Sequence, residues 1–284
     1  MPATQRLLTW ARAAAISPLP ASTQALTGPT TSQPEDDSGF MDWVTPLLVL
    51  AGALIGGLLN GLTGFGTGLT ALPLWLQVLE PVVAAQLVSV ASIAGHLSAP
   101  PSLWRETDWR GLRPMLFAGL LGVPLGLWLL PLIRVTVFKL TVGVVLVCYC
   151  LFMLFAAGRV HVRRRHQAAE LGVGFLGGVL GGIAGLSGPP PIVWGALRAW
   201  PKAQRRQTLQ AFNTAVLAAM LAASLTGGLV DSRLLIAAAI ALPATLLGNW
   251  LGDRLYRSLD DQGFDRIVLG LVFLSGCVLI WSNR

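Results

Sequence analysis

Two short segments without charged residues are the parts of this sequence best suited to bind a small anion. The first reads Gly64-Phe65-Gly66-Thr67-Gly68, and the second reads Gly185-Leu186-Ser187-Gly188-Pro189, with two more prolines after it. Glycine adopts backbone conformations closed to other residues, and proline removes an amide donor, so each segment predicts a helix break. A helix that restarts after a break presents free N–H groups and the positive end of its dipole. We therefore predict an anion site built from main-chain donors at these breaks.

Polar side chains follow each break and could line a cavity with it. Gln86 comes after the first break, and Gln207 and Asn213 come after the second. Singly, each would more often hydrogen-bond a neighbouring helix, but together they favour a polar site. The candidate substrate-binding residues are Gly64, Phe65, Gly66, Thr67, Gly68, Gln86, Ser187, Gly188, Pro189, Gln207 and Asn213.

His96 is the one histidine inside an apolar segment. Imidazole titrates near physiological pH, so His96 is a candidate for proton coupling, and a histidine held in the core by hydrogen bonds is the equal alternative. No Asp or Glu lies clearly in the middle of an apolar segment, which disfavours carboxylate-based cation coupling. The three cysteines show neither metal-site spacing nor a disulfide framework, and we predict no metal and no cofactor.

The second break also matches the Gly-x-Ser-Gly pattern of rhomboid intramembrane proteases, with Ser187 as the nucleophile. Such a serine needs a base within hydrogen-bonding reach, and no histidine follows Ser187 in the chain. Three prolines directly after Gly188 also disfavour an exposed catalytic helix start. The sequence therefore favours a protein that is not an enzyme, with the protease and an anion channel as alternatives.

The composition is that of an integral membrane protein. Hydrophobic residues make up 54%, charged residues 12%, and the mean hydropathy is +0.67, whereas soluble domains have about 25% charged residues. Apolar runs of about 20 residues recur, which is the length that crosses a bilayer. The net charge is +7, but Lys and Arg lie in short loops and so report topology rather than nucleic-acid binding. The expected partners are a small anion and the lipid bilayer, and a homo-oligomer is left open.

The chain is an internal duplication. Pairs that recur at one constant offset are Gly57 and Gly178, Gly61 and Gly182, Gly64 and Gly185, and Gln86 and Gln207. Pairs that recur at a second offset include Gly122 and Gly248, and Gly126 and Gly252. Duplicated halves with a helix break early in each half are typical of transporters whose site is built from interrupted helices.

Each half divides into five apolar segments. They cover 43–62, 68–79, 82–103, 111–132 and 136–157, then 171–183, 189–200, 207–228, 234–252 and 266–282. The first two segments of each half fit a hairpin that dips into the membrane and turns partway. We predict an all-α polytopic membrane protein with two inverted repeats, each with a broken or re-entrant hairpin followed by three spanning helices. The domains are a disordered tail at 1–40, repeats at 41–158 and 171–284, and a basic cytoplasmic linker at 159–170.

The charge distribution supports the inverted arrangement. If each half crosses the membrane an odd number of times, most Lys and Arg fall on one side, in loops near 105–113, 159–165, 198–206 and 254–266. An even number would move the last two groups to the other side and remove the bias. The side rich in Lys and Arg should be cytoplasmic, which places both termini on the non-cytoplasmic face of the inner membrane.

The first break, read from Asn60 to Pro73, is Asn-Gly-Leu-Thr-Gly-Phe-Gly-Thr-Gly-Leu-Thr-Ala-Leu-Pro. This glycine-rich break before a proline, repeated weakly in the second half, resembles the sulfite exporter TauE/SafE family from about Trp43 to Trp281. Thr67 stands where that family commonly has glycine, and the second break is richer in proline. The resemblance implies a multi-pass inner-membrane transporter that exports small anions such as sulfite, sulfonates or related sulfur oxyanions. Together with the interrupted helices, it predicts alternating access at a site between the two breaks.

Overall fold

The computed structural model describes residues 38–99, 104–105, 107–155 and 166–258, together with positions 270 and 273. Every regular element in these residues is a helix, as the sequence predicts. The elements are α2 (Ser38–Thr63), α3 (Thr67–Trp75), α4 (Pro81–Leu97), α6 (Trp109–Leu129), the 3-10 helix η1 (Leu130–Leu132), α7 (Val135–Phe155), α8 (Gln167–Ala184), α9 (Pro189–Leu197), α10 (Lys202–Thr226) and α11 (Ser232–Ser258).

Six helices of the described chain are long and apolar enough to cross a membrane. Their spans are Trp43–Thr63, Trp109–Leu132, Val135–Phe152, Gln167–Ala184, Lys202–Thr226 and Ser232–Ser258. The helix α4 is also apolar but has only 17 residues. The predicted segment 266–282, the tail before residue 38 and most of the linker at 159–170 lie outside the described residues.

Each region predicted as a hairpin is a long helix followed by a short one. The long arms α2 and α8 have 26 and 18 residues, and the short arms α3 and α9 have 9 residues each. At 1.5 Å per residue the long arms extend about 39 and 27 Å, and the short arms only about 13 Å. The first arm of each hairpin is therefore long enough to span, and only the second is too short.

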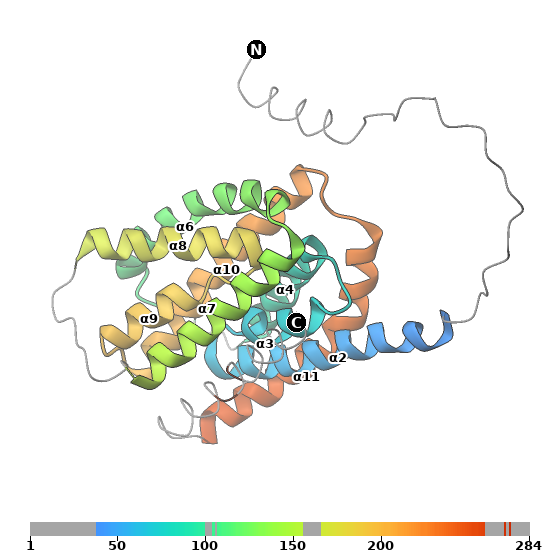
Figure 1. Cartoon of the computed structure of the whole chain (residues 1–284). Helices are drawn as coiled ribbons and strands as arrows, with labels where there is room; N and C mark the ends of the chain where they lie inside the picture. Colours follow the sequence, from blue (N-terminus) through green and yellow to red (C-terminus); the bar gives the residue numbers. More distant parts are fainter. Residues whose placement is uncertain are drawn as a thin grey trace, which may run out of the picture. The chain divides into compact units, whose positions relative to one another are not determined.

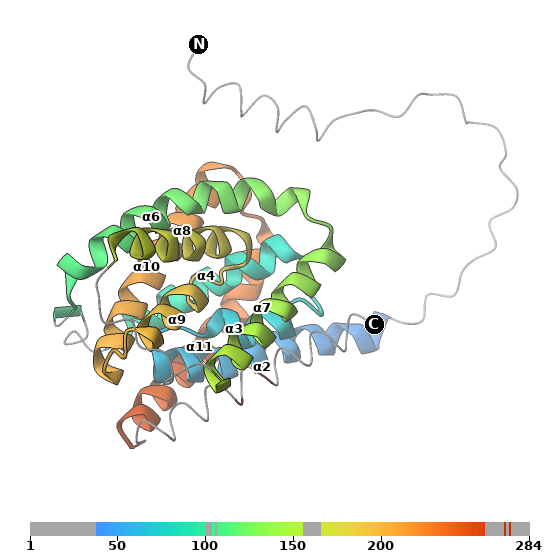
Figure 2. The same ribbon diagram turned by 60° about the vertical axis from the view of Figure 1, so that its left-hand side comes forward.

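Glycines let two pairs of helices pack with their backbones nearly in contact. A Cβ on Gly122 or Gly126 of α6 would overlap the main chain of α8, and one on Gly248 or Gly252 of α11 would overlap the main chain of α2. In both pairs residue numbers rise together along the contact, so the two helices run parallel. Figures 1 and 2 show α6 beside α8 in both views. These glycines pack helices together, as their spacing predicts.

The helices α4 and α10 pack against each other in opposite directions. Gln86, early in α4, donates to the Leu229 carbonyl just beyond α10 at 3.1 Å. The Ser89 hydroxyl lies 2.9 Å from the sulfur of Met220, and the Gln210 side chain lies 3.5 Å from the His96 carbonyl. These contacts run from one end of α4 to the other, so α4 and α10 form an antiparallel pair.

The start of α11 is fixed by Asp231. Its carboxylate accepts hydrogen bonds from the Arg233 amide at 2.7 Å and the Ser232 hydroxyl at 3.0 Å. These donors favour the charged carboxylate, so they hold the pKa of Asp231 below its ordinary value. An exposed ion pair of 2.9 Å between Arg233 and Glu80 joins the starts of α11 and α4.

Candidate functional site

Both breaks occur at the predicted glycines, and they have similar backbone geometry. Gly64 and Gly185, which correspond in the duplication, have φ values of 75° and 67°. Gly66 has a φ of 123°, which is also closed to most residues with side chains. We call residues 64–68 the first tip and residues 185–189 the second tip.

The first tip leaves several main-chain donors free. The Phe65 amide lies 3.2 Å from the Thr63 hydroxyl, and the Gly64 amide donates to the Asn60 carbonyl at 2.7 Å. The next amides with a main-chain acceptor are those of Leu69 and Thr70, which both reach the Gly66 carbonyl. Among the described residues, no acceptor meets the amides of Gly66, Thr67 and Gly68. The start of α3 therefore offers the donors that an anion needs.

The second tip offers fewer main-chain donors than the first. Its helix α9 begins with Pro189, Pro190 and Pro191, which have no N–H group, and Ile192 already donates to the Gly188 carbonyl at 3.1 Å. Only the amides of Ser187 and Gly188 are left. Proline therefore leaves fewer main-chain donors at the start of α9 than at the start of α3.

The two tips meet in the interior of the protein. A Cβ on Gly68 would lie 2.9 Å from the Gly185 carbonyl oxygen, and one on Gly188 would lie 2.8 Å from the Phe65 ring. The residues around the space between them are Phe65, Gly66, Gly68, Leu69, Gly185, Leu186, Gly188, Pro189 and Asn213. This cavity is about 10 Å³, close to the minimum for one water molecule. The tips are therefore adjacent but closed to a sulfite-sized ligand.

The other candidate residues are buried at different places. The Ser187 hydroxyl donates to the Asn213 side chain, which ties the second tip to α10. Gln86 is bonded to the Leu229 carbonyl, and its own side-chain oxygen is buried without a partner in the described chain. Gln207 is also buried but, like Gln86, does not line the cavity between the tips. Thr67 is fully buried, and its hydroxyl meets no hydrogen-bond partner among the described residues.

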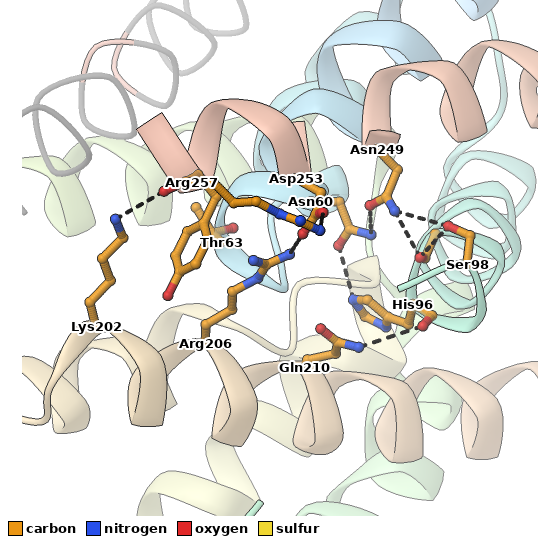
Figure 3. A network of polar contacts seen from close by, with 12 residues as sticks. Asn60, Thr63, His96, Ser98, Lys202, Arg206, Gln210, Asn249, Asp253 and Arg257 are labelled. Carbon is orange, nitrogen blue, oxygen red and sulfur yellow. Dashed lines mark hydrogen bonds and ion pairs between the residues drawn. The ribbon is translucent and has the colours of Figure 1, made fainter. Parts of the chain in front are cut away.

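His96 lies at the centre of a hydrogen-bond network beside the first tip (Figure 3). Its Nε2 is 3.0 Å from the Asn60 side-chain oxygen, and its Nδ1 is 2.6 Å from the Thr214 hydroxyl. Asn249 of α11 donates to the Gly95 carbonyl and the Ser98 hydroxyl, both at 2.9 Å. The network joins α2, α4, α10 and α11 just before the chain breaks at Gly64.

A charged cluster next to the first tip was not among the sequence candidates. Arg206 of α10 is only 4% exposed, and it donates to Asp253 of α11 at 2.8 Å. Lys202 and Arg206 both lie over the Tyr256 ring, and Arg257 pairs with the other carboxylate oxygen of Asp253. Figure 3 labels Lys202, Arg206, Asp253 and Arg257. The sequence did contain a signal, because Arg206, Gln210 and Asn213 follow helical spacing and so share one face of α10.

The surroundings of Ser187 do not support a protease site. Its hydroxyl is bonded to Asn213, whereas the imidazole of His96 is engaged by Asn60 and Thr214. Among the described residues, no group of three or more His, Cys, Asp or Glu side chains could hold a metal ion.

Comparison with known proteins agrees with this architecture. Residues 48–279 match the family model described as sulfite exporter TauE/SafE. The chain is also 26% identical over 241 residues to the "Probable sulfite/organosulfonate exporter TauE" of Cupriavidus necator, covering 83% of this chain and 94% of that protein. No solved structure gives a significant match. The match to the family model covers most of the chain, and the protein therefore belongs to the sulfite exporter TauE/SafE family.

Proposed function

We propose that this protein is a secondary transporter that exports small anions, namely sulfite, sulfonates or related sulfur oxyanions. Its family consists of membrane transporters and not of enzymes, and its relative in Cupriavidus necator is named as a sulfite/organosulfonate exporter. The observation that carries the proposal for the site is the meeting of two interrupted helices around a small buried cavity. Free amides at the start of α3 supply anion donors without a buried negative charge.

Transport would proceed by alternating access. The cavity between the tips is too small for the substrate, so the described conformation is closed at this point. Movement of one hairpin against the other would open it first to one side of the membrane and then to the other. The alternative is an anion channel, in which the site would be open to both sides of the membrane at the same time.

The two halves would be inverted repeats. The helices α4 and α10, which correspond in the duplication, pack in opposite directions. The close contacts also correspond, because α2 packs on α11 as α8 packs on α6. An approximate two-fold axis in the membrane plane would produce both features.

The orientation of the protein in the membrane would be set by the helix ends that are rich in Lys and Arg. A cavity of about 150 Å³ brings together Asp108 at the start of α6, Glu170 early in α8, Arg198 at the end of α9 and Gln204 early in α10. Lys202, at the start of α10, donates to the Tyr256 carbonyl near the end of α11. These ends belong to the loops rich in Lys and Arg, so we assign them to the cytoplasmic side of the inner membrane. Both chain termini would then lie on the opposite side.

The orientation can be tested with single cysteines at Arg134 and Arg205 in a cysteine-free background. Membrane-impermeant thiol reagents should label Arg205→Cys only from the cytoplasmic side and Arg134→Cys only from the other side. Labelling of both positions from the same side would contradict the inverted arrangement.

His96 would couple anion transport to protons. When the imidazole is neutral, Nδ1 can accept from the Thr214 hydroxyl; when it is charged, Nδ1 donates and that hydroxyl turns to the Gln210 carbonyl, 2.7 Å away. Nε2 donates to Asn60 in both states. The network can therefore hold either protonation state with one hydroxyl rotation, as a proton carrier requires.

Transport assays in proteoliposomes test the function directly. Purified full-length protein should move sulfite or a sulfonate down its gradient, saturate with concentration, and exchange internal for external anion. Saturation with accelerated exchange supports a carrier, whereas linear flux at high concentration supports a channel. No flux of any sulfur oxyanion, from protein that is folded, would contradict the proposed substrate class.

A further inference from the structure

Arg206 is a buried cation with donor groups left over. Its side chain is 4% exposed, and a single nitrogen donates to Asp253 at 2.8 Å. The guanidinium lies over the Tyr256 ring, 4.2 Å from its centroid. Its Nε is buried and has no hydrogen-bond partner among the described residues. A guanidinium has five N–H donors in a planar fork that matches an oxyanion, so this arrangement leaves much of its capacity unused.

Arg206 also touches the first tip. A Cβ on Gly64 would lie 2.8 Å from the Arg206 carbonyl oxygen and 3.2 Å from its Cγ. Figure 3 shows the guanidinium of Arg206 pointing to Asp253. The main chain and the Cγ of Arg206 therefore contact the turn whose far side lines the cavity between the tips, and the guanidinium extends from there to Asp253.

Asp253 can release Arg206 without becoming unpaired. Its other carboxylate oxygen accepts from Arg257 at 2.7 Å, and Arg257 is 68% exposed and on the same helix. Removing one partner of a buried ion pair is costly because it leaves a charge without compensation. Here Arg257 still compensates the carboxylate, so an exchange of partners at Arg206 avoids much of that cost.

The second tip has no such charge. Gly185 faces the carbonyl of Ala85 at the position where Gly64 faces Arg206, and Leu127 stands in α6 where Asp253 stands in α11. The duplication alone therefore does not explain the ion pair, which belongs to one side of the site.

We propose that Arg206 is a substrate-contact residue, which binds the oxyanion in place of the Asp253 carboxylate on the side of the first tip. The ligand class is a small oxyanion with at least two oxygens available to the fork, such as sulfite or a sulfonate. Asp253 acts as the internal counter-ion that holds Arg206 when no anion is present. This inference rests on the proposed function as an anion transporter.

The test measures sulfite binding to purified full-length protein at constant ionic strength, by the shift of Tm with added sodium sulfite. Arg206→Gln should weaken binding by at least about tenfold, the effect of losing a charged hydrogen-bond donor. Asp253→Asn should tighten binding by several-fold, because the internal competitor loses its charge. Arg254→Gln is the matched control, since Arg254 is an exposed cation on α11 that stacks on Trp250 instead, and it should leave binding unchanged.

The opposite changes in two variants separate substrate contact from a structural role. If Arg206 only holds the end of α2, both variants should lower Tm without ligand and leave sulfite affinity unchanged, which would overturn the inference. If Arg206→Gln fails to fold, the Asp253→Asn variant tests the inference by itself. Sulfite binding to Asp253→Asn that is unchanged or weaker than in the wild type then overturns the inference. If the wild-type protein binds and transports sulfite and Arg206 has no role, only this inference is contradicted. If the wild-type protein neither binds nor transports sulfite, the proposed function is contradicted as well.

Discussion

The two tips have similar backbones and different chemistry. Both turn through a glycine with positive φ and both precede a short helix of 9 residues. The first tip keeps three free amides and lies beside the Arg206–Asp253 pair. The second tip begins its helix with three prolines and lies beside Ala85. The two tips thus share the break but differ in the groups around it, and under the proposed function most of the donors for the anion lie at the first tip.

The largest expected effect comes from filling the space between the tips. Gly188 has a φ of −72°, so valine fits its backbone but would meet the Phe65 ring. We expect Gly188→Val to lower transport per folded molecule by at least about 100-fold, since a displacement of about 1 Å in a site can cost that much. Transport should be measured in proteoliposomes beside Tm in detergent.

Comparing Gly66→Val with Gly188→Val separates a loss of transport from a loss of stability. Gly66 has a φ of 123°, where a side chain costs roughly 1–3 kcal/mol, so this variant should lose stability as well as transport. Equal losses of Tm in the two valine variants, with transport proportional to the surviving protein, would mean that both glycines serve packing only.

A smaller effect is expected at His96, which has no counterpart at the second tip because Leu217 occupies the corresponding position of α10. His96→Gln keeps a donor for Asn60 but cannot carry a proton. Transport by the variant should lose most of the pH dependence of the wild type, because glutamine does not titrate. The comparison needs initial rates at each pH and equal amounts of folded protein. A pH profile of transport identical to that of the wild type would mean that His96 has a structural role only.

The smallest effect tests the donors themselves. Pro189→Ala would give the start of α9 the amide that the first tip already has. One more main-chain donor contributes about 0.5–1.5 kcal/mol, so sulfite should bind about two- to tenfold more tightly. Pro114→Ala, in α6 away from both tips, is the control. Unchanged affinity in Pro189→Ala would show that the amides of the second tip do not face the anion.

Much of the fold could be predicted from the sequence because it depends on local chemistry. Glycine and proline determine where the helices break, and hydrophobic length determines which helices can cross a bilayer. The repeated glycines predicted close packing, and Gly122 and Gly248 do lie against neighbouring backbones. The predicted segments 43–62 and 171–183 end within one residue of the ends of α2 and α8.

The candidate site was harder to predict because it depends on contacts between distant segments. Arg206 belongs to a region rich in Lys and Arg, and from the sequence alone it reads as a topology signal. The structure shows that its side chain pairs with Asp253 and that it contacts Gly64. Gln86 and Gln207 were chosen as corresponding polar residues, yet neither lines the cavity between the tips.

The central claim is that the anion binds between two tips that open alternately, and Ser187 is the position at which to test it. Ser187→Cys, in a background without Cys148, Cys150 and Cys277, places a thiol at the second tip. Small membrane-impermeant thiol reagents should reach it from each side of the membrane in turn, and sulfite should slow the labelling. Labelling from one side only, at a rate that sulfite does not change, would contradict the account.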